Sequence, residues 1–193
     1  MKSKDAASEP APALLSGGRK RLLTFSNQLT IARILVLPIF VLILLEGSPR
    51  ARAVAGGLFV LAASTDWLDG YLARRRAQVT PLGELLDPVA DKLLITAALI
   101  PLVSLGEVDA WVAGIILGRE FLVTALRAVA LQRGRVVAAS RLGKTKMSLE
   151  VGAIILLILG FLPPLGTVLI WSAMGVAVVS AIDYFRLLLR ELT

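Results

Sequence analysis

Four aspartates stand at a spacing that suits the binding of divalent metal. They are Asp66, Asp69, Asp87 and Asp91. In an α-helix, residues three or four positions apart lie on one face, so each pair presents two carboxylates together. Carboxylate oxygens are the ligands that Mg²⁺ and Mn²⁺ prefer in proteins. Two such ions would bind both the attacking and the leaving oxygen of a phosphoryl transfer, so the pattern indicates metal-dependent chemistry on a diphosphate.

The residues beside the aspartates suit a ligand that carries phosphate. Small residues, which let a diphosphate approach a helix backbone closely, occur at Gly70, Ala73 and Gly83. Arg74 is well placed to bind a phosphate oxygen. An alternative is that the acids only mark a helix end at the water interface and pair with the arginines at 74–76. That interpretation suits a single aspartate better than four at this spacing.

Two residue types that carry out much enzyme chemistry are missing. The chain has no cysteine and no histidine. Disulfides, thiolate nucleophiles, imidazole bases and the usual zinc ligand sets are therefore excluded. Acid–base chemistry must fall to carboxylates, Lys, Tyr or water.

Membrane helices are the elements that must position these residues. With 56% hydrophobic residues and a mean hydropathy of +0.79, the 193-residue chain is too apolar for a soluble domain of its size. Each ionised carboxylate in a membrane helix costs roughly 2.5–3.5 kcal/mol, so four would cost on the order of 10 kcal/mol without bound cations. A span needs about 20 mostly apolar residues. The sequence predicts an all-α integral membrane protein with six transmembrane helices, at 29–45, 51–72, 85–106, 109–131, 148–163 and 165–188.

The distribution of basic residues predicts the orientation. Seventeen of the 21 Lys and Arg residues fall before the first span, after the even-numbered spans, or at the borders of these segments. The positive-inside rule then places both termini and the aspartates on the cytoplasmic side. We expect residues 1–25 to form a disordered cytoplasmic tail and residues 26–193 a membrane catalytic domain. Topology and anionic head groups explain the net charge of +7, so no nucleic-acid partner is expected.

The fixed residues from Asp66 to Asp91 resemble the signature of the CDP-alcohol phosphotransferase family. The chain reads Asp-x2-Asp-Gly-x2-Ala-Arg-x8-Gly-x3-Asp-x3-Asp in this stretch and matches the signature at every defined position. The resemblance implies a six-helix fold, usually a homodimer, that transfers a phosphatidyl or similar group from a CDP-linked donor to an alcohol and releases CMP. It also implies that the four aspartates bind two ions, Mg²⁺ or Mn²⁺, and that Asp91 takes the proton of the acceptor hydroxyl.

The same resemblance implies where the donor binds. Its contacts correspond to Gly70, Ala73, Arg74, Thr80 and Gly83. The segment 26–33 looks like the start of the family's first span, which adds Asn27 and Thr30. The chain lacks the proline that many members carry before this Leu-Thr step. A helix cap and a snorkelling Arg33 would explain these residues equally well.

Basic residues of the fourth span and of the loop after it point to an acceptor that bears a phosphate. Arg119 lies inside an apolar run, where a charged residue is a functional candidate. Three more cations follow in an expected loop at 138–146, namely Arg141, Lys144 and Lys146. Adjacent helical residues point apart, so Glu120 is expected to be a poor partner for Arg119. Glu150 and Asp183 are candidates to pair with these basic groups instead.

The stretch from Thr65 to Lys92 is similar to bacterial family members that make phosphatidylglycerol phosphate. This similarity implies CDP-diacylglycerol as donor, sn-glycerol 3-phosphate as acceptor, membrane lipids as surroundings and the bacterial inner membrane as location. Inositol phosphate is the nearest alternative acceptor. A membrane prenyltransferase would also bind diphosphate through aspartates, but the chain is short for that fold. A cation or proton carrier would distribute its acids across the bilayer, whereas four of the fourteen acids here cluster at one depth.

Overall fold

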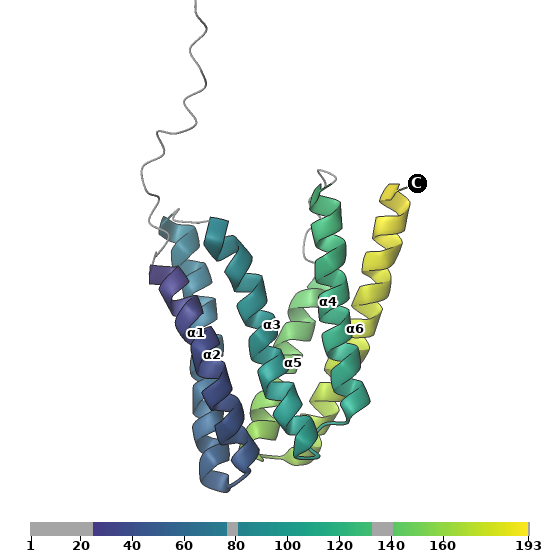
Figure 1. Ribbon diagram of the computed structural model, residues 1–193. Coiled ribbons are helices and arrows are strands. Elements are labelled where there is room, and N and C mark those ends of the chain that lie inside the picture. The colour runs from purple at the N-terminus through teal and green to yellow at the C-terminus, as the bar shows by residue number, and fades with distance from the viewer. Residues whose placement is uncertain (1–24, 77–80, 133–140, 193) are drawn as a thin grey trace, which may run out of the picture.

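Six helices and the turns between them make up the part of the chain that the computed structural model describes, residues 25–76, 81–132 and 141–192 (Figure 1). The helices are α1 (Phe25–Glu46), α2 (Pro49–Arg76), α3 (Pro81–Ser104), α4 (Ala110–Gln132), α5 (Arg141–Leu159) and α6 (Pro163–Leu192). Within these ranges, the structure describes the backbone but not the side chains at residues 25–26, 66–76, 81–85, 87, 141–144 and 187–192. Each predicted span overlaps one helix, so the all-helical class is confirmed, but the predicted fifth span, 148–163, ends too late because α5 stops at Leu159 and α6 begins at Pro163. The predicted tail, residues 1–25, lies outside the described residues except for Phe25.

The fifth helix begins earlier than the hydropathy pattern indicates. The prediction of a loop through residue 146 is wrong, because α5 already includes Arg141–Lys146. Arg141, Leu142, Lys144 and Lys146 are good helix formers, and a hydropathy window stops at the three charged residues rather than at the end of the helix. Lys146 therefore lies on a helix, five residues after the first residue of α5.

Membrane-spanning character is clearest for the first and last helices. Within the described residues, Asn27–Glu46 and Pro163–Arg186 are long and apolar enough to cross a bilayer by length and hydropathy. Many apolar side chains are exposed on the outside of the bundle, including Leu35, Leu42 and Val168. The fold is consistent with a bacterial membrane protein.

Three tight connections gather at one end of the bundle, called here the turn end (Figure 1). They join α1 to α2, α3 to α4 and α5 to α6, and each contains one glycine with a positive φ: Gly47, Gly106 and Gly160. A residue with a side chain rarely adopts this conformation, which closes the preceding helix. Because the chain reverses at each turn, the carboxyl ends of α2 and α4 and the amino ends of α3 and α5 lie at the opposite end, called the aspartate end.

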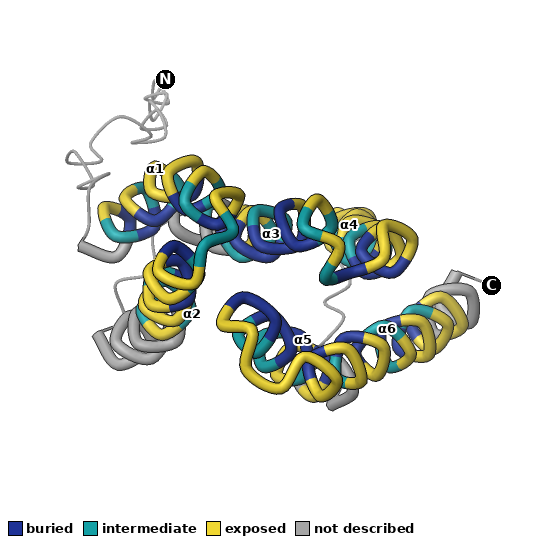
Figure 2. The backbone as a smooth tube through the Cα atoms, turned by 90° about the horizontal axis from the view of Figure 1, so that it is seen from below, coloured by how far each residue is buried: buried dark blue, intermediate teal, exposed yellow. Residues whose placement is uncertain are grey.

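The helices form two layers. Seen along the bundle, α1, α3 and α4 make one row and α2, α5 and α6 the other, with buried residues between them (Figure 2). The shared core contains fully buried residues from both rows, such as Phe59, Leu99 and Ile154. At the turn end, the guanidinium of Arg52 on α2 forms an ion pair with Glu107 of the α3–α4 connection. This ion pair therefore links the two rows at the end of the bundle away from the aspartates.

Gly166 allows α5 and α6 to approach closely, and we expect its replacement to destabilise the protein. A Cβ atom there would lie 2.8 Å from Cδ2 and 2.9 Å from Cγ of Leu157, a side chain that is itself fully buried. Such overpacking costs typically about 1–3 kcal/mol. Gly166→Ala should therefore lower the thermal unfolding midpoint in detergent. Gly175→Ala, on the same helix but with nothing within 4 Å of its added Cβ, should leave the midpoint unchanged or raise it. Equal midpoints for the two variants would contradict the close approach.

Candidate active site

The backbone places the four aspartates on two neighbouring helices. Asp66 and Asp69 lie on α2, and Asp87 and Asp91 lie on α3, which runs in the opposite direction and packs against α2. All four belong to the half of their helix that faces the aspartate end. Asp91 is half-buried beside the fully buried Ala90. The arrangement brings the two predicted pairs to the same level of the bundle.

The other side chains of this cluster are not described, so their convergence remains a prediction. Among the side chains that the structure describes, which include only Asp91 of the four aspartates, no group of three carboxylates could hold a metal ion. Gly70, Ala73 and Arg74 follow on α2, and Gly83 lies on α3. Thr80 falls outside the described residues.

The first turns of α1 bring a buried polar face to the aspartate end. Asn27 is 1% exposed and Thr30 is 2% exposed, and Arg33 continues the same face one turn later. Nε and Nη2 of Arg33 are buried, which goes against the alternative explanation of this residue as a snorkelling arginine. This face points into the bundle, where it can contribute polar groups to a bound ligand.

An apolar cavity of about 220 Å³ lies between α1, α2 and α3. Arg33 and Thr65 give it polar walls, and Thr65 directly precedes Asp66 in the chain. The remaining walls are apolar, with Val36, Phe40 and Leu94 among them. A pocket that is apolar beside a segment rich in charge suits a ligand with a hydrocarbon part and an ionic head.

Charged residues from α4 and α5 form a network in which Lys146 and Glu150 are buried and Arg119 and Glu120 are half-buried. Glu120 Oε1 lies 2.6 Å from Arg119 Nη1 and 2.8 Å from Lys146 Nζ. Lys146 also forms an ion pair with Glu150 one turn along α5, and both of these residues are only 2% exposed. Two positive and two negative groups make the network neutral, which lowers the cost of its burial in an apolar bundle.

The network corrects one prediction and confirms another. Glu120 does pair with its neighbour Arg119, contrary to the argument from helical directions. Both side chains are long enough to turn toward α5 and α6, where Lys146 also contacts the Glu120 carboxylate. The candidate pairing of Glu150 with a basic group is confirmed by its contact with Lys146. Asp183 is an exposed residue of α6.

The sixth helix supplies polar residues that the sequence interpretation missed. Arg119 donates from Nε to the carbonyl of Ala177, at 3.3 Å, and from Nη2 to the hydroxyl of Ser180. Closer to the aspartate end, Arg127 Nε donates to the Tyr184 hydroxyl at 2.9 Å, and its guanidinium carbon lies 5.2 Å from the ring centre. Positions 177, 180 and 184 share one helical face, and that spacing was the signal available in the sequence.

Known proteins match this chain over most of its length. The family model described as CDP-alcohol phosphatidyltransferase matches residues 23–179. A CDP-diacylglycerol–glycerol-3-phosphate 3-phosphatidyltransferase of Bacillus subtilis is 42% identical, with 82% of this chain and 92% of the relative covered. A protein of the same name from Rickettsia bellii is 40% identical, with 83% and 92% covered. A probable phosphatidylglycerophosphate synthase of Mycobacterium tuberculosis is 39% identical, with 91% and 86% covered.

Proposed function

The chain belongs to the CDP-alcohol phosphatidyltransferase family, and from this we propose that it transfers a phosphatidyl group from CDP-diacylglycerol to sn-glycerol 3-phosphate. The products are phosphatidylglycerol phosphate and CMP, and the reaction belongs to phospholipid biosynthesis. The observation that carries the proposal is that relatives from separate bacterial groups, at 39–42% identity, are named for this one reaction. The chain also carries the complete aspartate pattern on α2 and α3.

The aspartate residues fit a hard divalent cation. They supply four carboxylates on two packed helices, and the chain contains no Cys or His that would favour a softer metal. Asp66, Asp69, Asp87 and Asp91 would hold Mg²⁺ or Mn²⁺, with two ions expected. When bound, such ions would neutralise the diphosphate and stabilise the charge on the attacking and leaving oxygens.

The donor is proposed to bind where α1, α2 and α3 meet. The buried polar face of Asn27 and Thr30, together with Arg74 and Thr80, would contact the nucleotide and its phosphates. Gly70, Ala73 and Gly83 would leave room for the diphosphate against the helix backbones. The apolar cavity beside Thr65 supports this placement, because a diacylglycerol carries hydrocarbon next to its phosphates.

Asp91 is proposed to act as the base. Its carboxylate takes the proton from the primary hydroxyl of glycerol 3-phosphate as that oxygen attacks the phosphorus bearing the lipid. The bond between this phosphorus and the bridging oxygen of the diphosphate breaks, and CMP leaves with the electron pair. Holding both reactants in line supplies much of the rate enhancement.

The phosphate of the acceptor is proposed to bind to basic residues of α4 and α5: Arg119, Arg141, Lys144 and Lys146. The first and last of these lie in the charged network of α4 and α5. Arg141 and Lys144 lie on the first turns of α5, at the aspartate end.

The protein is proposed to act as a six-span homodimer of the bacterial inner membrane, with both termini and the aspartate end toward the cytoplasm. The helices have 19 to 30 residues. At 1.5 Å per residue, even the shortest is about 28 Å long, close to the roughly 30 Å thickness of a hydrocarbon core.

A product assay tests the reaction directly. Purified protein in detergent is given CDP-diacylglycerol, a divalent metal and one acceptor at a time, and the lipid product is identified by its mass. We expect phosphatidylglycerol phosphate, with one CMP released per lipid, when glycerol 3-phosphate is the acceptor. Neither inositol phosphate nor glycerol should support comparable turnover. Preferential use of inositol phosphate would replace the acceptor, and ion flux in vesicles without CMP release would favour a carrier.

A further inference from the structure

We infer that Glu120 is a positioning residue for the acceptor's phosphate, an inference that rests on the function proposed above. A single carboxylate oxygen, Oε1, contacts both Arg119 and Lys146, which are two of the proposed phosphate-binding cations. These cations come from different helices, α4 and α5. Their relative position therefore depends on the Glu120 side chain between them.

Residues of the sixth helix also hold the Arg119 side chain in position. Its guanidinium has five N–H donors in a fixed plane. The contacts recorded in the described chain use three of them, on Glu120, the Ala177 carbonyl and Ser180. This leaves the planar group oriented by α4 and α6 together, with donor capacity for a further anion.

Lys146 is constrained in a similar way. Its ammonium group contacts Glu120 at 2.8 Å on one side and Glu150 on the other. Its side chain is 3% exposed, so it does not reach bulk water. An ammonium group has three donors, and two are used by these carboxylates. Because α5 also carries Arg141 and Lys144 at its start, fixing Lys146 against α4 also fixes the height of that first turn.

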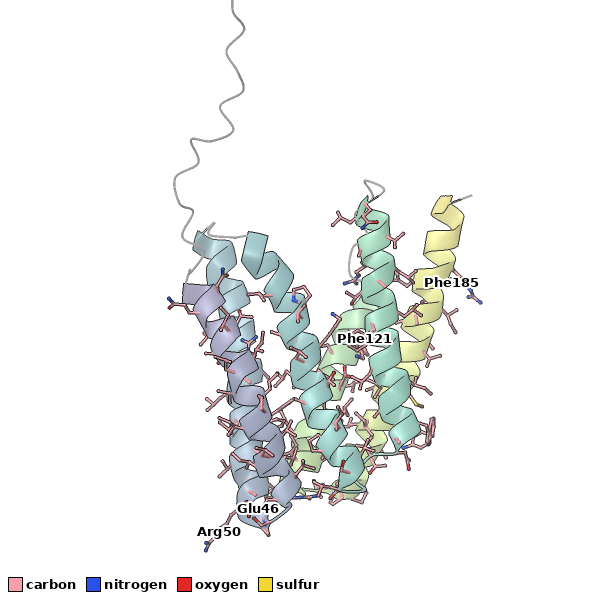
Figure 3. The ribbon with its side chains drawn as sticks, in the orientation of Figure 1. Glu46, Arg50, Phe121 and Phe185 are labelled. Atoms are coloured by element: carbon pink, nitrogen blue, oxygen red, sulfur yellow. The ribbon has the colours of Figure 1, made fainter. Side chains whose placement is uncertain are left out.

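The position of the network along the bundle agrees with such a role. Phe121, the neighbour of Glu120, lies about halfway along α4, and Phe185, the neighbour of Tyr184, lies nearer the aspartate end (Figure 3). The polar contacts of α4 with α6 therefore run from the middle of the bundle toward the aspartate end. Glu46 and Arg50 mark the turn end in the same view.

Two effects of Glu120 on an acceptor phosphate have opposite signs, which makes the role testable. Its negative charge repels a phosphate, so removing that charge alone would strengthen acceptor binding. Its contacts hold the cations in place, so removing them would weaken acceptor binding. If positioning dominates, Glu120→Gln should raise the KM for glycerol 3-phosphate by about tenfold or more, since small misplacements of binding groups are costly. The KM for CDP-diacylglycerol should change less than twofold.

Glu107→Gln is a matched control. Glu107 has the same exposed side-chain fraction as Glu120, 25%, and also forms an ion pair with an arginine, but it lies at the turn end. We expect unchanged KM values for both substrates. Ser180→Ala is a second test, because it removes one of the two contacts of Arg119 on α6 and leaves the bond to the Ala177 carbonyl, without changing any charge. It should raise the KM for glycerol 3-phosphate in the same direction by a smaller factor.

The outcomes separate this inference from the proposed reaction. Wild-type protein that does not consume glycerol 3-phosphate would overturn the proposed function and this inference with it. Wild-type activity combined with an unchanged or lower acceptor KM in Glu120→Gln would overturn the positioning role alone. Should Glu120→Gln fail to fold, as judged by its thermal midpoint, Glu120→Asp decides, because it keeps the charge but shortens the side chain that contacts Arg119 and Lys146: an unchanged acceptor KM in that variant overturns the inference.

Discussion

Asp91→Asn is expected to lower the rate of CMP release by about 10²- to 10⁴-fold, the range that a general base contributes. Asparagine has nearly the shape of aspartate, so the packing beside the buried Ala90 should be retained. It can neither take a proton from the acceptor hydroxyl nor offer a charged ligand to a metal. The measurement is steady-state CMP release in detergent, with both substrates saturating.

Asp109→Asn provides the control for this variant. Asp109 is exposed and directly precedes α4 at the turn end, which is the end of the bundle opposite the aspartates of α2 and α3. Asparagine caps a helix as well as aspartate does, so neither stability nor turnover should change. Near-normal turnover of Asp91→Asn would remove Asp91 from the role of base.

Removal of divalent metal is expected to abolish activity, with recovery when Mg²⁺ or Mn²⁺ is added back. Four carboxylates on two packed helices repel one another without cations, and the diphosphate of the donor would add to that repulsion. The same reasoning predicts an effect on stability that does not depend on catalysis. Metal at 100 times its dissociation constant should stabilise the fold by about 2.7 kcal/mol.

The metal titration is read in two ways. CMP release and the thermal unfolding midpoint should rise over the same range of metal concentration. Asp69→Asn should shift both curves to higher concentration, whereas Asp109→Asn should shift neither. Activity that resists a chelator would rule out the metal site.

The sequence predicted the helices well because long apolar runs leave few alternatives for a chain in a membrane. All six predicted spans overlap helices. The start of α5 was missed because three of its first six residues, Arg141, Lys144 and Lys146, are charged although the segment is helical. Hydropathy records charge, whereas helix formation depends on side-chain propensity and on packing, which here places Lys146 against Glu120.

The candidate site was predicted unevenly for a related reason. The aspartate site could be predicted from the sequence, because each pair of aspartates is three or four residues apart and so shares a helical face. The network of Arg119 with Ser180 joins residues 61 positions apart and depends on how α4 packs on α6. The pairing of Arg119 with Glu120 was missed because the prediction considered only the directions in which adjacent residues leave one helix. It did not consider the residues of α5 and α6 that draw both side chains to the same side.

In the six-span topology proposed above, the three hairpins of the fold are the units in which the chain would enter a membrane during synthesis. Each pair of helices is closed by a short turn, so each pair can insert together, with only that turn to be carried across. The α5–α6 turn, residues 160–162, carries no charge at all. In that topology Arg52 and Glu107 would cross the membrane with different hairpins and neutralise each other only after both have crossed. Their ion pair would then form when the second hairpin docks on the first, and its formation would report that docking step.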